Sequence, residues 1–325
     1  MQSARETLRL ARVSNRERLP QLAGGTFITD GGMETSLIFH HGFELPCFAS
    51  FVLLEDEAGR RALRTYLDRF VTIAREHGVG LVLDTPTWRA STDWGTQLGY
   101  SPDAIADVNR RAAAFVERVR EEAGDGPPIV VSGAVGPRRD AYRADDGMSA
   151  DEAERYHSAQ LATLADTTVD LATAYTLTNA AEAIGIVRAA GTAGLPAAIS
   201  FTVETDGRLP DGQPLREAID EVDDATGGSA AYFLINCAHP THFADVLPRL
   251  GTTGGRIRGL RANASSKSHA ELDESDTLDD GDPVELAAEY AALRRLLPNV
   301  NVVGGCCGTD HRHVAAICER WLEAA

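Results

Sequence analysis

Three cysteines lie where two short apolar runs of the sequence end. Cys237 follows "AAYFLIN", and the adjacent Cys306 and Cys307 follow "NVNVVGG". Thiolates are soft ligands that suit Zn²⁺, and three protein ligands leave the fourth tetrahedral position open, as in catalytic zinc sites. The glycines beside the pair let the backbone turn sharply, so that neighbouring side chains can face one ion. The pattern indicates a zinc site held by Cys237, Cys306 and Cys307.

The residues alone leave other interpretations of these thiols open. Adjacent cysteines could instead form a vicinal disulfide, act as a redox or metal-storage site, or be buried small apolar groups. Cys47 and Cys318 are interpreted as structural, because Cys318 lies on the apolar face of the last predicted helix. His239 is the best candidate for an extra ligand, and its alternative is an ordinary loop histidine, as for His311 and His313.

Eight short apolar runs alternate with longer helical patterns along the chain. The runs are 25–29, 79–85, 128–135, 169–175, 196–203, 230–236, 256–263 and 299–305. Repeated strand–helix units favour a parallel sheet, and a count of eight favours a closed (β/α)8 TIM barrel. An open doubly wound sheet is the alternative, although no G-x-G-x-x-G follows the first strand. In a barrel the three cysteines would meet at the C-terminal mouth, where barrel enzymes keep their active sites.

Capping residues and glycines predict several helix ends. Ser101 and Ser149 precede helical patterns as capping residues, and Gly78, Gly191 and the pair 227–228 are predicted to close helices.

The predicted domain organisation is one barrel domain over residues 1–325. It has a short N-terminal extension to about residue 24 and a polar insertion at about 265–283, which we expect to be a surface loop near the site.

The charge balance and the apolar runs exclude several classes of protein. The chain has 325 residues, a net charge of −17, and Lys267 as its single lysine, so it lacks the basic face that nucleic acids require. No apolar run approaches the ~20 residues of a membrane span, and the N-terminus lacks a signal-peptide pattern. Five thinly spread cysteines predict reduced thiols and a cytoplasmic location. A homo-oligomer is left open.

Three motifs resemble one family of enzymes. The segments "TDGGMET" (29–35), "INCAHP" (235–240) and "GGCCGT" (304–309) are similar to motifs of the homocysteine S-methyltransferase family, from about Thr26 to about Ile317. The resemblance implies a zinc-dependent (β/α)8 barrel whose open metal position takes a small-molecule thiol, usually homocysteine. That thiol would then attack the methyl group of a small-molecule donor, and the product would be methionine.

The resemblance also implies a set of substrate-binding residues. Asp30, Gly31 and Gly32 match the homocysteine-binding turn, in which the carboxylate would pair with an ammonium group and the glycines would let amides reach a carboxylate. Other residues of the set are Glu34 beside this turn, Thr85 in the second-strand segment, Asn236 before Cys237, and Asn263 in "RANAS" (261–265).

One position departs from the family pattern. After the fourth strand the family usually has a glutamate that binds the substrate amine, whereas this sequence has Tyr175 followed by Thr176. A phenol can form a hydrogen bond but cannot supply the charge of a carboxylate. Tyr175 is still assigned to substrate binding, and the acceptor is predicted to be homocysteine or a related thiol.

The donor is predicted to be a sulfonium, S-methylmethionine or S-adenosylmethionine, because the chain lacks folate and cobalamin modules. A betaine-like donor is the alternative. Trp88, Trp94 and Tyr175 could make cation–π contacts with an onium methyl, or could simply pack. A zinc hydrolase or lyase on the same barrel is a further alternative, which the all-cysteine ligand set disfavours.

Overall fold

The computed structural model describes residues 15–143, 147–275 and 277–324, and over these the chain forms a closed barrel of parallel strands. The strands are β1 (Phe27–Ile28), β2 (Gly80–Asp84), β3 (Ile129–Val135), β4 (Leu171–Leu177), β5 (Ala197–Phe201), β6 (Tyr232–Asn236), β7 (Ile257–Ala262) and β8 (Val302–Gly305). They pair in chain order, and β1 closes the barrel on β8 through Phe27 opposite Val302. The predicted (β/α)8 TIM barrel is confirmed, and each strand lies inside its predicted run except β4, which extends two residues past the predicted end at 175.

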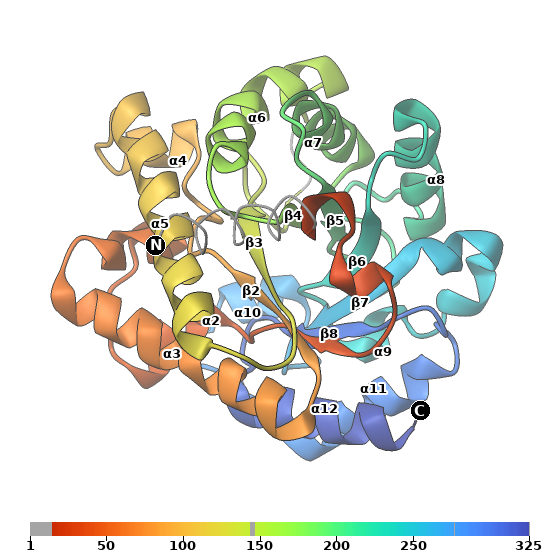
Figure 1. The fold of residues 1–325 in the computed structure, drawn as a ribbon. Helices are drawn as coiled ribbons and strands as arrows, with labels where there is room; N and C mark the ends of the chain where they lie inside the picture. Colours follow the sequence, from red (N-terminus) through yellow and green to blue (C-terminus); the bar gives the residue numbers. More distant parts are fainter. Residues whose placement is uncertain (1–14, 144–146, 276, 325) are drawn as a thin grey trace.

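Helices surround the strands (Figure 1). The α-helices are α2 (Met33–Thr35), α3 (Glu57–His77), α4 (Thr92–Gln97), α5 (Pro102–Ala123), α6 (Ala150–Ala165), α7 (Ala180–Thr192), α8 (Leu215–Thr226), α9 (Pro240–Phe243), α10 (His269–Asp273), α11 (Pro283–Arg294) and α12 (His311–Glu323). Short 3-10 or π turns are η1 (Pro20–Leu22), η2 (Ser36–His40), η3 (Pro46–Phe48), η4 (Ser50–Leu54), η5 (Leu247–Arg249) and η6 (Gly251–Arg256). Across the described ranges, no helix has the length and apolar character needed to cross a membrane.

Most predicted helix ends are confirmed. The Ser101 side chain accepts the Ala104 N–H, and Ser149 forms a capping box at the start of α6. Gly78 and Gly227 close α3 and α8 in the left-handed conformation. The prediction for Gly191 was wrong: it lies inside α7, and Gly194 takes the positive φ two residues after that helix ends.

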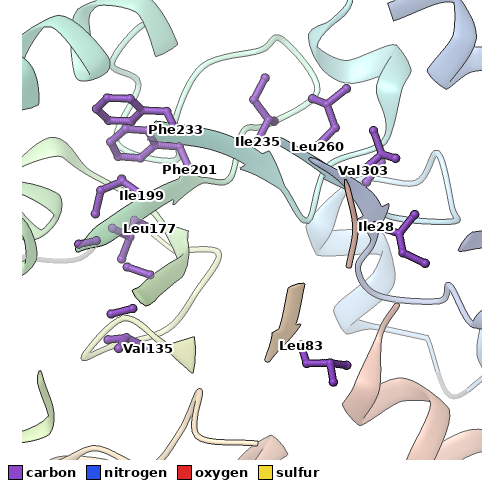
Figure 2. Packing of buried hydrophobic residues seen from close by; sticks show 14 of the residues in the cluster. Ile28, Leu83, Val135, Leu177, Ile199, Phe201, Phe233, Ile235, Leu260 and Val303 are labelled. Carbon is purple, nitrogen blue, oxygen red and sulfur yellow. The ribbon is translucent and has the colours of Figure 1, made fainter. Parts of the chain in front are cut away.

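The apolar side chains of the strands form two layers because successive residues point to opposite faces. One set, including Leu83, Phe201 and Phe233, packs outward beneath the helices (Figure 2). The other set fills the barrel interior and includes Val82, Tyr175 and Val302. Tyr175 is thus an interior residue at the mouth end of β4.

The predicted polar insertion at 265–283 follows β7 and contains the short helix α10. Ser265, His269 and Asp279 of this segment line a cavity at the barrel mouth. The segment is less irregular than the polar composition indicates, because Ser268 and Glu271 cap α10 reciprocally. The predicted N-terminal extension falls mostly on residues 1–14, which lie outside the described residues.

Candidate metal centre

A cavity of about 450 Å³ lies at the C-terminal ends of the strands. All of the predicted substrate residues line it, together with Cys237, Cys306 and Cys307: Asp30, Gly31, Gly32, Glu34, Thr85, Tyr175, Asn236 and Asn263. Residues from β1, β2, β4, β6, β7 and β8 therefore meet at one place, as the barrel topology requires. Their roles toward a substrate stay predictions.

Strand hydrogen bonds hold the backbone of the three cysteines. The Cys237 N–H donates to the Arg261 carbonyl at 3.1 Å, and the Cys306 N–H donates to the Ala262 carbonyl at 2.8 Å. The Cys307 carbonyl accepts the Ala264 N–H at 3.0 Å. The barrel ladder thus continues through the thiol-bearing residues, which fixes their positions.

The three sulfur atoms lie within 4.8 Å of one another, and no other group of metal-ligating side chains occurs in the described part of the chain. Cys237 Sγ lies 3.7 Å from Cys307 Sγ and 2.7 Å from Cys306 Sγ. With bonds of ~2.3 Å, two sulfurs of a tetrahedral zinc site stand roughly 3.7–3.8 Å apart. The first pair matches this spacing, and the second must open by about 1 Å to admit the ion. The donor set therefore fits Zn²⁺.

None of the five cysteines forms a disulfide, so the vicinal disulfide considered for Cys306 and Cys307 is absent from this structure. Cys318 is buried in α12, as expected of a structural residue, and Cys47 is half-buried outside the cluster.

Cys306 is the thiol that most favours the anionic form. Hydrogen bonds from Cys237 and Cys307 lower its pKa well below the usual range, and the nearby Arg261 guanidinium lowers it further. Asn236 Nδ2 also donates to this sulfur, at 3.8 Å. The Asn236 side chain is fixed in turn, because its Oδ1 accepts from the Thr176 N–H and the Ser200 hydroxyl.

Two residues near the sulfurs were missed by the sequence analysis. The Tyr142 hydroxyl lies 3.3 Å from Cys237 Sγ and 3.7 Å from Cys307 Sγ. The Tyr142 ring packs against the His269 ring with centroids 4.4 Å apart, and His269 Nε2 donates to the Cys237 carbonyl at 2.5 Å. Both residues come from loops at the mouth, and no spacing relates them to the cysteine motifs. The polar insertion was the one signal pointing to His269.

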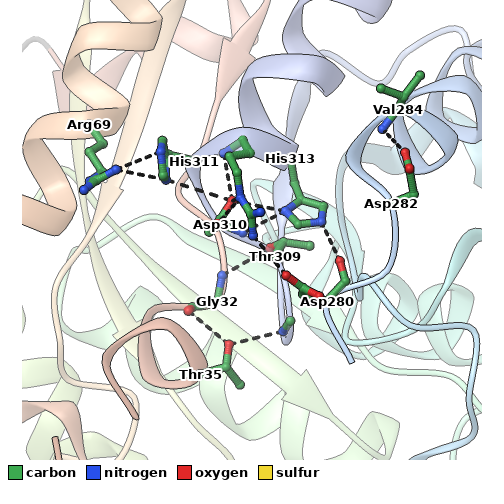
Figure 3. A network of polar contacts seen from close by, with 12 residues as sticks. Gly32, Thr35, Arg69, Asp280, Asp282, Val284, Thr309, Asp310, His311 and His313 are labelled. Carbon is green, nitrogen blue, oxygen red and sulfur yellow. Dashed lines mark hydrogen bonds and ion pairs between the residues drawn. The ribbon is translucent and has the colours of Figure 1, made fainter. Parts of the chain in front are cut away.

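The histidines considered as ligands lie outside the thiol cluster. His239 caps α9, and its Nε2 lies 3.2 Å from Glu289. His311 contacts Arg69, and His313 lies between Asp310 and the Asp280 carbonyl (Figure 3). These contacts anchor the start of α12 directly after the cysteine turn.

The glycines of the first-strand turn are required by close packing. A Cβ at Gly32 would lie 2.5 Å from the Cys306 carbonyl oxygen, and one at Gly31 would lie 2.8 Å from that of Thr309. The Gly32 N–H donates to the Thr309 carbonyl at 2.9 Å, and Thr35 Oγ1 links the Gly32 carbonyl to the Gly308 N–H (Figure 3). The Gly32 N–H therefore bonds within the protein, whereas the sequence analysis expected the amides of this turn to reach a substrate carboxylate.

Arg261 is the main buried cation of the cavity, and sequence analysis had not assigned it a role. It forms ion pairs with Asp30, at 2.5 Å, and with Asp84, and its Nε donates to the Gly305 carbonyl at 3.0 Å. Burial raises the pKa of Asp30 to about 7, although Arg261 opposes the rise.

The aromatic rings considered as contacts for an onium methyl group already contact arginine side chains of the protein. The Arg89 guanidinium lies 4.0 Å from the Trp88 ring centroid and 3.9 Å from that of Trp94. Arg261 lies 4.7 Å from the Tyr175 centroid. One face of each ring is occupied by arginine, so any donor cation must use another surface.

Fold and site together define a (β/α)8 barrel enzyme with a cluster of three thiols at its mouth that could hold a metal ion. Residues 27–321 match the model of the homocysteine S-methyltransferase family. The chain belongs to that family and is an S-methyltransferase-type enzyme.

Solved structures give the same fold. The metallated form of the homocysteine methyltransferase MmuM from Escherichia coli is 20% identical, with a TM-score of 0.73 over 94% of this chain and 100% of that chain. The oxidized form of MmuM is also 20% identical, with a TM-score of 0.74 over 94% of this chain and 99% of that chain. No curated protein sequence gives a significant match.

Proposed function

We propose that this enzyme transfers a methyl group from a small sulfonium, S-methylmethionine or S-adenosylmethionine, to homocysteine, giving methionine. The observation that carries the proposal is the convergence of Cys237, Cys306 and Cys307 in a cavity of about 450 Å³. Zn²⁺ held by these cysteines would supply the Lewis acidity that keeps an acceptor thiol deprotonated at neutral pH. A metallated form of MmuM supports the same kind of centre.

The protein residues have distinct roles in this scheme. The cysteines hold the metal and leave one position open, and Asn236 orients Cys306. The acceptor gives up its thiol proton on binding, and its sulfur then forms the new bond to the methyl carbon. The bond between that carbon and the donor sulfur breaks with its electron pair, so the donor leaves as a neutral thioether.

The charge of the cavity favours a cationic donor. Its lining includes the carboxyl groups of Asp30, Glu34, Asp84, Asp140 and Asp279, against the guanidinium groups of Arg89 and Arg261. Three thiolate ligands add further negative charge, which attracts a sulfonium and raises its local concentration. We propose the cytoplasm as the compartment, because three free thiols persist under reducing conditions.

The test is turnover by zinc-loaded protein. The protein is incubated with homocysteine and, separately, with S-methylmethionine, S-adenosylmethionine and betaine, and methionine is followed by mass spectrometry. We expect methionine with at least one sulfonium, and none with the Cys307→Ser variant under the same conditions. Absence of methionine with every donor would overturn the proposal, and turnover with betaine alone would overturn the sulfonium assignment.

A further inference from the structure

Asp30 and Asp84 share the Arg261 guanidinium but differ in their free acceptors. Both oxygens of Asp30 have partners: Oδ1 accepts from Arg261, and Oδ2 accepts from the Tyr66 hydroxyl at 3.2 Å. Asp84 Oδ2 accepts from the Tyr175 hydroxyl at 2.8 Å and from Arg261. Asp84 Oδ1 is buried and has no partner among the described residues. A buried carboxylate oxygen without a donor calls for one from a ligand.

A second unpartnered acceptor lines the same cavity. Asn263 is 2% exposed, and its Oδ1 has no hydrogen-bond partner in the described ranges. Asn263 follows the last residue of β7, and it lines the same cavity as Arg261. Arg261 is paired with Asp84, and both Asp84 and Asn263 line the cysteine cavity. The cavity wall here offers acceptors, which suits a group that only donates, such as an ammonium.

Tyr175 explains how Asp84 is held in place. Tyr175 occupies the position where the family resemblance leads us to expect an amine-binding glutamate, and its hydroxyl donates to Asp84 instead. Tyr175 lies on β4 and Asp84 on β2, on either side of β3. Arg261 lies against the Tyr175 ring and also pairs with the carboxylate. Two contacts thus fix Asp84 Oδ2 and leave Oδ1 for another partner.

We propose, on the basis of the function proposed above, that Asp84 Oδ1 binds the ammonium group of the acceptor, with Asn263 Oδ1 as a neighbouring acceptor. The carboxylate that recognises the amine has then moved from β4 to β2, and Tyr175 is a positioning residue for it. The acceptor class is an α-amino thiol. The loss of the glutamate from β4 is compensated, and homocysteine remains the acceptor.

The experiment compares two acceptors that differ only in the amine. Zinc-loaded protein is titrated calorimetrically with homocysteine and with 4-sulfanylbutanoic acid, which keeps the thiol and the carboxylate. We expect the wild type to bind homocysteine at least ~10-fold more tightly, as a charge-assisted hydrogen bond provides. Asp84→Asn should abolish this preference while changing the dissociation constant of the des-amino thiol by less than about 3-fold. An unchanged preference in Asp84→Asn, or none in the wild type, would overturn the proposal.

Matched variants separate recognition from folding. Asp30→Asn should change binding of both thiols alike, and a selective loss of homocysteine there would contradict the assignment to Asp84. Tyr175→Phe keeps the ion pair between Asp84 and Arg261 and should reduce the preference for homocysteine over 4-sulfanylbutanoic acid by a few-fold. This variant tests the proposal even if Asp84→Asn does not fold. Tyr175→Glu added to Asp84→Asn should restore part of the preference. Binding without turnover would refute the proposed methyl transfer while leaving the amine assignment intact.

Discussion

The two sides of the cavity are built in different ways. On the cysteine side, three side chains of one type follow β6 and β8, and strand hydrogen bonds fix their backbone. The recognition side, by which we mean Asp84, Tyr175 and Arg261, is drawn from the three strands β2, β4 and β7, and its members hold one another by charge and hydrogen bonds. Metal binding on the cysteine side requires a cysteine at each position. Binding of a charged group on the recognition side requires only that a carboxylate reach the right place in the cavity.

This difference explains how one side can change while the other is kept. A metal site needs its full ligand number, so replacing one thiol changes the chemistry. A carboxylate for an ammonium group can sit on any strand that faces the same cavity, provided that neighbouring donors orient it. The proposed role of Asp84 is such an exchange between β4 and β2, in which the Tyr175 hydroxyl orients the carboxylate.

The largest effect is expected on the cysteine side. Cys306→Ser should lose bound zinc and lower kcat/KM on the order of 10³-fold, because two remaining thiols cannot hold the ion in a catalytic geometry. Zinc is measured by mass spectrometry of the metal after gel filtration. Cys47→Ser is the matched control and should keep full zinc. Retention of zinc and activity by Cys306→Ser would contradict the claim that the cysteine side needs all three thiols.

A large loss of stability with zinc retained is expected on the recognition side. Arg261→Met leaves Asp30 and Asp84 buried without their cation, which should cost about 3–5 kcal/mol of unfolding free energy near pH 8. Urea unfolding of the zinc-loaded variant measures it. Arg256→Met removes a half-buried pair with Asp223 and should cost about 1 kcal/mol or less.

The Arg261→Met deficit should grow with pH. Burial raises the folded pKa of Asp30 from 3.8 to about 7, so the folded state holds this proton more tightly than the unfolded state does. Its contribution to stability is therefore full below about pH 4 and is lost as pH rises through 7. Arg261 opposes that rise, so its removal moves the pKa of Asp30 higher still. At pH 5 Asp30 is largely neutral with or without Arg261, whereas at pH 8 only the wild type has the cation that stabilises the charged carboxylate. An equal deficit at both pH values would contradict the assigned charges.

The smallest effect concerns the glycine turn that joins β1 to the cysteine side. Gly32→Ala places a methyl group against the Cys306 carbonyl and should cost roughly 1–3 kcal/mol and weaken zinc binding. Gly191→Ala is a control of opposite sign, because Gly191 lies inside α7 with open space around it and should gain up to ~1 kcal/mol. Thermal unfolding with and without chelator measures both. Equal behaviour of the two variants would refute the packing argument.

The fold was predictable because each strand is a short apolar run bounded by turn residues, and eight such units point to a closed barrel. Helix ends depended on single residues, so Gly191 was misplaced while Gly194 takes the left-handed turn. The insertion at 265–283 was interpreted as a loop because its polar composition hides the short capped helix α10.

The clustering of the three cysteines was predictable because each follows a predicted strand, and strand ends of a barrel meet at its mouth. The recognition side was only partly predictable. Arg261 and Asp84 carry a signal that could have found them: Arg261 precedes the assigned Asn263 by two residues, and Asp84 continues the face of the interior Val82. Tyr142 carries no such signal, because its contact with Cys237 joins residues 95 positions apart through a loop.

The most direct test of the central claim is X-ray absorption at the zinc edge, with and without homocysteine. We predict three sulfur neighbours at ~2.3 Å in the resting protein and four once homocysteine is added. The same measurement with 4-sulfanylbutanoic acid should give the fourth sulfur only at higher concentration. A sulfur count that does not change with homocysteine would contradict an open three-thiol centre that takes the acceptor.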